Sequence, residues 1–420
     1  MSPCTRLRLL ATAALLLLSA ASFAAPAPRA WDPDPFTPLT TARIAALPAN
    51  ERPAWEAYWA ASENLATQLP TRPAPDRSQL KPMSGPPIGG LHTKGLRLSE
   101  PDAWYATAEA QAIADRVVAA QLPVGAWIKG IDYTHAPADG PRVKVEPTFD
   151  NDATVSELYF LIRVLAAAGD APRADVWRTS VERGLRYIFA AQYPNGGFPQ
   201  MYPLIGGYHD GITYNDDAMA QVLKLLRDVA GGRKQFAVIA APLRDEAATR
   251  FQRGLACVLA TQLRNPAGAL TVWCQQYDPL TLRPAAARNF EPIADCSRES
   301  ATLVLLLMSL PQPSPEVIAS VEAAAAWFRA TALKDLRIAR APADRRGEAV
   351  ASPGAPPLWA RFYEPGTTTP IFGDRDRTIH YDLAEVSPER IAGYAWFTDA
   401  PARVLEKLDA WRKKHAATKS

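Results

Sequence analysis

Apolar residues recur at helical spacing through most of this chain after about residue 101. Four apolar residues within 158–165 occupy positions i, i+3, i+4 and i+7, and four within 222–229 repeat that spacing. Each set forms one apolar stripe on a helix, whereas the alternation typical of strands is scarce. The pattern therefore predicts a mainly α protein. Further helices are predicted over residues 55–69, 173–192, 244–262, 299–310 and 314–332.

Three polar clusters stand directly before predicted helices and form a weak internal repeat. They are Phe149-Asp-Asn-Asp-Ala-Thr154, Tyr214-Asn-Asp-Asp-Ala-Met219 and Ser297-Arg-Glu-Ser-Ala-Thr302. If hairpins of helices are arranged around a ring, every second helix begins on the same face, and the three clusters meet there. This arrangement is an α/α toroid, an incomplete α/α barrel with long loops and little β structure.

The first 25 residues have the layout of a secretory signal peptide. Arg6 and Arg8 precede an apolar run over residues 9–18, and small residues follow up to Ala25. The run is too short to span a bilayer, and a core helix is the alternative interpretation. We expect cleavage near Ala24 or Ala25, a periplasmic or secreted mature protein, and no membrane association after cleavage.

The remaining chain divides into two predicted parts. Residues 26–100 are rich in Pro and are interpreted as an extension that packs on the main domain, and residues 101–420 are interpreted as the toroid domain. The cysteines left after cleavage, Cys257, Cys274 and Cys296, match no zinc site. A disulfide between Cys274 and Cys296 remains open.

Charge excludes one class of partner. The sequence has 46 Lys and Arg against 43 Asp and Glu, a formal net charge of +3, which is too even for a nucleic-acid-binding protein. The sequence also lacks a P-loop, a dinucleotide fingerprint, a His-Glu-x-x-His zinc motif and a nucleophile elbow. The common nucleotide-dependent and zinc-dependent enzyme classes are therefore disfavoured.

Acidic and amide side chains are concentrated in the first two clusters, at Asp150, Asn151, Asp216 and Asp217. Helix capping explains one such residue at each helix start, because these side chains accept hydrogen bonds from free N–H groups. Each cluster, however, supplies three in a row. Surplus oxygen ligands on one face suit a hard cation such as Ca²⁺.

Three arginines lie in segments without helical periodicity: Arg288, Arg361 and Arg375. Each has aromatic or acidic neighbours, so a structural role by stacking or by burial of the aliphatic stem is an alternative for any one of them. Their functional interpretation is bidentate binding of carboxylates by the planar guanidinium group.

Several motifs, taken together and in order, resemble those of pectate lyases of polysaccharide lyase family 10. They cover about residues 122–396 and include the first two clusters, Ala191-Gln-Tyr-Pro-Asn-Gly-Gly-Phe-Pro-Gln-Met-Tyr-Pro203, Ala287-Arg-Asn-Phe-Glu291, Leu358-Trp-Ala-Arg-Phe-Tyr-Glu364 and Asp374-Arg-Asp-Arg-Thr-Ile-His-Tyr-Asp382. The resemblance implies an α/α toroid whose groove binds polygalacturonate (homogalacturonan), an acidic polysaccharide, with Ca²⁺ between protein acids and the substrate carboxylate.

The resemblance also implies residue roles. Asp150, Asn151 and one of Asp216 and Asp217 match calcium ligands, Arg288 matches the proposed Brønsted base, and Arg361 and Arg375 match substrate-binding arginines. The implied reaction is anti β-elimination to 4,5-unsaturated oligogalacturonates, by a protein expected to be a monomer. Because arginine holds its proton in solution, a neutral Arg288 needs nearby positive charge, and we expect alkaline activity.

Two alternatives remain at this point. One is a glycoside hydrolase on the same toroid, with Asp216 and Glu299 as acid and base. This alternative leaves the three arginines without a role. The other is an inactive, calcium-dependent pectin-binding protein.

Overall fold

A computed structural model describes residues 26–31, 37–69, 93–135, 146–339, 347 and 349–416. The predicted signal peptide lies outside these residues, as does the segment 70–92 of the Pro-rich extension. Within the described part, no helix has the length and apolar character needed to cross a bilayer.

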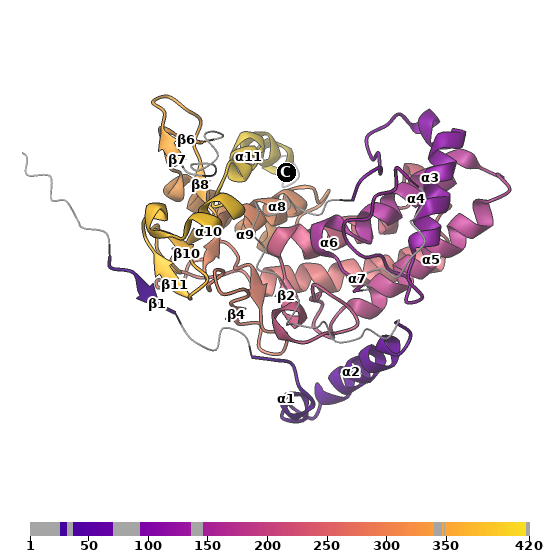
Figure 1. The fold of residues 1–420 in the computed structure, drawn as a ribbon, viewed down its shortest axis with the longest axis horizontal. Coiled ribbons are helices and arrows are strands. Elements are labelled where there is room, and N and C mark those ends of the chain that lie inside the picture. The colour runs from indigo at the N-terminus through magenta and orange to yellow at the C-terminus, as the bar shows by residue number, and fades with distance from the viewer. Residues whose placement is uncertain are drawn as a thin grey trace, which may run out of the picture.

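Three helical hairpins form the centre of the molecule: α4 (Val155–Ala168) with α5 (Ala174–Ala191), α6 (Ala218–Gly231) with α7 (Ala241–Ala260), and α8 (Ser297–Met308) with α9 (Pro315–Thr331). The first helices contact one another in the order α4, α6, α8, and the second helices in the order α5, α7, α9 (Figure 1). Two layers of helices result, an inner layer of α4, α6 and α8 and an outer layer of α5, α7 and α9, as in an incomplete α/α toroid. The predicted mainly α fold is confirmed.

A glutamine after three successive outer helices repeats one hydrogen-bonding pattern. The Nε2 of each glutamine donates two hydrogen bonds. One goes to a carbonyl of a nearby loop, and the other goes to a carbonyl of the next outer helix. The pairs between helices are Gln121 with Ser180 at 2.9 Å, Gln192 with Arg250 at 2.8 Å, and Gln262 with Ser320 at 3.1 Å. Each amide fixes one outer helix to the next, and α3 (Ala108–Ala120), which precedes Gln121, therefore belongs to the outer layer.

Buried tryptophans satisfy carbonyls that the outer helices leave free at their ends. Each indole N–H donates to a carbonyl near the end of the preceding outer helix: Trp127 to Val117 at 2.8 Å, Trp273 to Val258 at 2.7 Å, and Trp359 to Phe328 at 2.8 Å. The tryptophans thereby anchor the chain where it turns back toward the starts of the inner helices.

The remaining elements lie around the hairpins. α11 (Ala400–Ala416) packs on α8 and α9, and α10 is Pro388–Gly393. All strands are short, pair antiparallel and form small sheets, with Ile212 opposite Tyr277 in one of them. The sheet orders are β1-β11-β10-β9-β5, β12-β8, β2-β3-β4 and β6-β7. The strands are β1 (Arg29–Ala30), β2 (Ile212–Thr213), β3 (Gln276–Tyr277), β4 (Pro284–Ala285), β5 (Asp295–Cys296), β6 (Leu336–Ile338), β7 (Ala349–Ala351), β8 (Trp359–Ala360), β9 (Phe362–Tyr363), β10 (Pro370–Gly373), β11 (Thr378–His380) and β12 (Phe397–Thr398).

The described part of the N-terminal extension packs on the main domain. It contains α1 (Thr41–Ala45) and α2 (Arg52–Ala66). Trp55 and Tyr58 of α2 lie against Tyr193, with ring centroids 5.3 and 4.8 Å away, and the Tyr58 hydroxyl donates to the Ala191 carbonyl. Further along the molecule, β1 adds to the edge of β11. The division at residue 100 stays a prediction.

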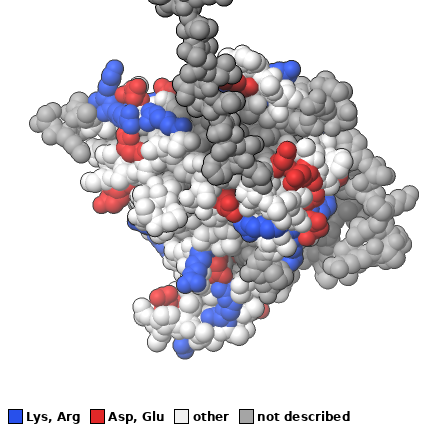
Figure 2. Space-filling model, turned by 90° about the vertical axis from the view of Figure 1, so that its left-hand side faces the viewer, with Lys and Arg blue, Asp and Glu red and all other residues white. Residues whose placement is uncertain are grey.

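The three cysteines of the described part form no disulfide. Cys257, Cys274 and Cys296 are free and buried, so the structure does not contain the disulfide considered for Cys274 and Cys296. On the face in Figure 2, basic and acidic side chains lie close to one another. This view agrees with the even charge balance of the sequence.

Candidate active site

The first two polar clusters fold into the same tight turn before an inner helix. One turn is the 3-10 segment η3 (Asp150–Asp152) before α4, and the other is η5 (Asn215–Asp217) before α6. The second and third residues of both turns have positive φ: 52° and 62° in η3, 49° and 65° in η5. Asn and Asp tolerate this left-handed region best among residues other than glycine. The sequence repeat is therefore a repeat of backbone conformation.

The two turns contact each other, and η5 also contacts α8. The three clusters therefore meet on one face, as the sequence analysis predicts. The first two clusters border a cavity of about 280 Å³, which is lined by carboxylates, cations and aromatic groups. Its lining is Ile128, Lys129, Glu146, Thr148, Asp150, Gln200, Met201, Ile205, Tyr208, His209, Asn215, Asp216 and Arg288.

Asp150 is a buried carboxylate on the wall of this cavity. It is 5% exposed and forms an ion pair with Lys129. Its backbone N–H donates to the Thr148 hydroxyl at 3.0 Å, which fixes the start of the turn. A cation already neutralises this acid, so another cation has to share or replace Lys129.

Asp216 and Asp217 are adjacent in sequence but differ in surroundings. Asp216 lines the cavity and lies 3.2 Å from both Arg298 and Arg361. Asp217 does not line it, and its Oδ2 lies 3.7 Å from Arg298. Burial raises the pKa of Asp217 to about 6. The geometry favours Asp216 as the carboxylate available to a ligand.

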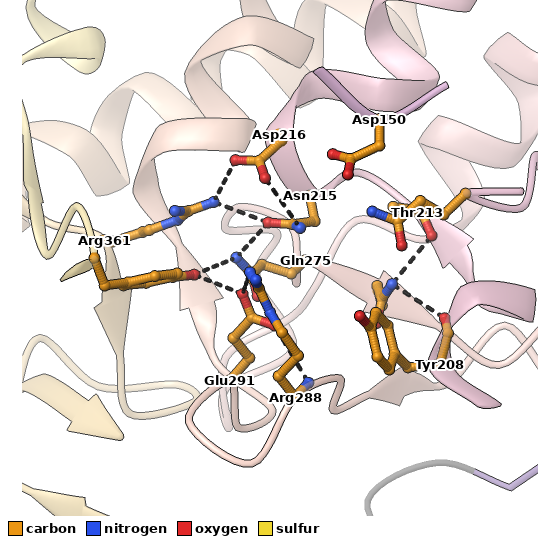
Figure 3. A network of polar contacts seen from close by, with 12 residues as sticks. Asp150, Tyr208, Thr213, Asn215, Asp216, Gln275, Arg288, Glu291 and Arg361 are labelled. Carbon is orange, nitrogen blue, oxygen red and sulfur yellow. Dashed lines mark hydrogen bonds and ion pairs between the residues drawn. The ribbon is translucent and has the colours of Figure 1, made fainter. Parts of the chain in front are cut away.

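Arg361 lies behind the cavity wall, where its side chain is 4% exposed. Its Nη2 donates to Asn215 at 2.9 Å and pairs with Asp216 (Figure 3). The same nitrogen also pairs with Glu299. Burial disfavours ionisation of Glu299, but the charges of Arg361 and Arg298 outweigh it and lower the pKa of Glu299 to about 2. Glu299 therefore stays ionised at neutral pH.

Arg288 lines the cavity and is held from behind by Glu291. Arg288 Nε donates to Glu291 Oε2 at 2.7 Å, and Nη2 donates to Oε1 at 2.5 Å. Burial alone would lower the pKa of Arg288, but the hydrogen bonds and charge of Glu291 outweigh it and raise that pKa above its usual value. Arg288 is therefore a cation in this structure.

Arg375 lies near Arg288 but is far more exposed, with 59% of its side chain accessible. Its guanidinium carbon is 5.5 Å from the centroid of the Phe290 ring, and that of Arg288 is 4.8 Å from the same centroid. Glu389 holds Arg375 through two hydrogen bonds of 2.8 and 3.0 Å. The guanidinium groups of both arginines thus lie against the same phenylalanine ring.

The structure brings together most of the predicted site residues. Asp150, Asp216 and Arg288 line the cavity itself. Arg361 contacts Asp216 of the cavity wall, and Arg375 lies beside Arg288. Neither Asn151 nor Asp217 is part of the lining. Among the described residues, no group of three or more His, Cys, Asp or Glu side chains is arranged to hold a metal ion.

Sequence reasoning did not assign roles to Lys129, Arg298, Glu291 and Tyr394. Lys129 and Arg298 pair with the two predicted carboxylates, whereas Glu291 and Tyr394 are linked to Arg288. Only the spacing of Arg288 and Glu291, three residues apart in a turn, offers a signal in the sequence. The other partners come from distant segments.

Comparison with known proteins identifies the family. Residues 121–405 match the family model described as pectic acid lyase. A family 10 polysaccharide lyase from Cellvibrio cellulosa is 31% identical, with a TM-score of 0.66 over 74% of this chain and 94% of that chain. The chain belongs to polysaccharide lyase family 10. A mutant of a family 10 lyase from that organism, in complex with trigalacturonic acid, is also 31% identical, with a TM-score of 0.66 over 73% of this chain and 94% of that chain.

Comparison with curated proteins gave no match. The family confirms the predicted enzyme class, a polysaccharide lyase. The hydrolase alternative is also disfavoured by the site of this lyase, because Glu299 is 1% exposed and paired with Arg361. Arg361 and Arg298 hold the pKa of Glu299 low, and Glu299 does not line the cavity, so it is placed neither to give nor to take a proton as a hydrolase requires.

Proposed function

We propose that this pectate lyase cleaves α-1,4-linked polygalacturonate by calcium-assisted anti β-elimination and releases 4,5-unsaturated oligogalacturonates. One observation supports this proposal above the others: Asp150, Asp216 and Arg288 line the same cavity in a chain of this family. The trigalacturonic acid bound to a similar lyase supports the substrate class.

The donor set of the cavity fits Ca²⁺ as part of a shared site. Asp150 and Asp216 supply carboxylate oxygens, and such oxygens are the ligands that Ca²⁺ prefers. The described residues offer too few acids for a complete site, so galacturonate carboxylates would supply the remaining oxygens. Asn151 and Asp217 remain proposed ligands of lower rank, because neither lines the cavity. When bound, Ca²⁺ neutralises the galacturonate carboxylate and so acidifies the C5 proton.

Arg288 is proposed as the base that removes the C5 proton. Its side chain is 39% exposed and faces the cavity that carries the carboxylates. Because Glu291 keeps Arg288 protonated in the free protein, a basic Arg288 requires high pH or added positive charge nearby. The proposal therefore includes activity that rises toward alkaline pH.

Arg361 and Arg375 are proposed to bind substrate carboxylates. The exposed Arg375 can exchange Glu389 for a galacturonate carboxylate with little loss of packing. Arg361 is buried, so its charge acts on the cavity mainly through Asp216 and Asn215. If Asp216 held a cation, Arg361 would keep Glu299 and Asn215 as its partners.

One incubation tests the proposed function. The purified protein is mixed with polygalacturonate in the presence of Ca²⁺ or of a chelator, and ultraviolet absorbance and reducing ends are followed. We expect absorbance from the unsaturated product that stops with the chelator and returns with added Ca²⁺. Reducing ends without absorbance would indicate hydrolysis, and binding without turnover would indicate an inactive protein. Secretion, proposed from residues 1–25, is tested by locating the mature protein and its N-terminus.

A further inference from the structure

Glu291 is a buried carboxylate whose hydrogen bonds are directed at Arg288. Its side chain is 0% exposed. One oxygen accepts from the Nε and backbone N–H of Arg288, and the other accepts from Nη2 of Arg288 and from the Tyr394 hydroxyl at 2.7 Å. The Glu291 N–H donates back to the Arg288 carbonyl at 2.8 Å, so the two residues close one turn (Figure 3).

This arrangement uses two of the three guanidinium nitrogens of Arg288. Nε and Nη2 form the edge bound to Glu291, whereas Nη1 has no partner among the described residues. Since Glu291 lies outside the cavity lining and Arg288 belongs to it, Nη1 is the nitrogen left for the cavity.

The pairing with Glu291 affects which nitrogen of a neutral Arg288 can accept a proton. A neutral arginine lacks one proton, and the nitrogen that lacks it is the only basic one. A carboxylate that accepts from Nε and Nη2 excludes the tautomer without a proton on Nε. It also disfavours the tautomer in which Nη2 is the imine nitrogen, because an imine N–H is a weaker donor than an amine N–H and its lone pair is basic. The carboxylate thus acts as one does on the tautomer of a catalytic histidine. We propose that Glu291 is a positioning residue that selects the tautomer of neutral Arg288 in which Nη1 is the basic nitrogen.

This inference rests on the proposed role of Arg288 and deepens it. In the elimination step the C5–H bond breaks and an Nη1–H bond forms. The electron pair forms the C4–C5 double bond while the C4–O bond breaks, and the leaving oxygen takes a proton from water. Nη1 then releases its proton to solvent before the next turnover. Glu291 exchanges no proton and keeps both hydrogen bonds throughout.

The charge of Glu291 has a second effect that an experiment can separate from positioning. The titratable groups whose charge acts on Arg288 include Glu291, Tyr208, His209, Tyr394 and Arg375, and the charged residues that line the same cavity are Lys129, Glu146, Asp150 and Asp216. Of these, Glu291 contributes most to the raised pKa of Arg288. Removing its charge should make Arg288 neutral at lower pH, and strengthening its charge should do the reverse.

Four variants test the inference through the pH dependence of kcat on polygalacturonate. In Glu291→Gln we expect kcat to fall about tenfold or more, while the midpoint of the profile moves about one pH unit or more lower. Glu291→Asp keeps the charge and should lower kcat without that shift. Tyr394→Phe keeps the ring but removes the hydrogen bond to Glu291, so its midpoint should move higher. Glu322→Gln is the matched control, because Glu322 binds Arg412 through both carboxylate oxygens far from the cavity, and its profile should not change.

A lower kcat in Glu291→Gln, measured on the plateau of its own pH profile, supports the positioning role, and opposite midpoint shifts in Glu291→Gln and Tyr394→Phe support the charge effect. The positioning role is overturned if Glu291→Gln keeps the wild-type kcat on that plateau, whether or not its midpoint moves. If Glu291→Gln does not fold, a wild-type kcat in Glu291→Asp overturns it. Arg288→Ala, measured in parallel, separates the two claims: substantial turnover there removes the proposed base, whereas an inactive Arg288→Ala with an undiminished kcat in Glu291→Gln removes only the role of Glu291.

Discussion

Glu299 and Arg361 form an ion pair closed to solvent, with side chains 1% and 4% exposed. Cys296 Sγ donates to the second carboxylate oxygen of Glu299, and the Arg361 guanidinium lies 4.7 Å from the centroid of the Tyr394 ring. The pair connects the start of α8 with the residue between β8 and β9, behind the cavity wall. It is therefore a structural support of the site.

Breaking this pair should destabilise the protein. In Glu299→Gln, Arg361 loses its closest buried counter-charge, so we expect the free energy of unfolding to fall by about 3 to 5 kcal/mol. Denaturant unfolding measures the change. Glu100→Gln, at the exposed pair with Arg97, is the control and should stay within about 0.5 kcal/mol. A Glu299→Gln protein as stable as the wild type would contradict the supporting role of the pair.

Calcium dependence should distinguish the two adjacent aspartates. Asp216→Asn should raise the Ca²⁺ concentration for half-maximal activity by about tenfold or more, because Asp216 lines the cavity. Asp217→Asn should have a much smaller effect, because that side chain does not line the cavity. Titration of activity with Ca²⁺ after chelation measures both. A larger effect at Asp217 would reverse the proposed ranking of ligands.

Buried Glu157 should make stability depend on pH. Glu157 is 0% exposed, and burial raises its pKa from 4.5 to about 7. Because the folded-state pKa is the higher one, this contribution is complete below pH 4.5 and is lost as pH rises toward 7, by about 3 kcal/mol at most. In Glu157→Gln the fall in unfolding free energy between those pH values should be smaller than in the wild type. Equal slopes in the two proteins would contradict this assignment.

The N-terminal extension should contribute to stability through Trp55. This side chain is 4% exposed and lies against the buried Tyr193. Trp55→Ala should lower the free energy of unfolding by about 3 to 5 kcal/mol, as for other large buried aromatic residues. Glu56→Ala on the exposed side of the same helix is the control, with an expected change within about 0.5 kcal/mol. Equal stability of the two variants would show that the extension is only loosely attached.

Most of the long helices could be predicted from the sequence, but α3 and α11 were missed. The predicted segments 173–192 and 314–332 agree closely with α5 and α9. No prediction covered α3, because much of its buried face consists of alanines, which contrast little with polar residues. The short strands were also missed, because two to four residues cannot display an alternating pattern and these strands depend on pairing with distant segments.

For the site, the sequence predicted which clusters meet but not how their side chains are directed. The repeated polar clusters predicted one shared face, and the structure confirms that contact. The contrast between Asp216 and Asp217 depends on two consecutive left-handed residues, which no local pattern predicts. The positions of Arg298 and Lys129 depend on approach in three dimensions. These cations decide how strongly each acid is already neutralised.

The most direct test of the account is the turnover of Arg288→Ala on polygalacturonate with saturating Ca²⁺, measured together with binding of the polymer. The account predicts that formation of unsaturated product falls by about 10² to 10⁴ while binding is largely retained. Turnover close to that of the wild type, in a folded Arg288→Ala protein, would contradict the role of Arg288 as the base.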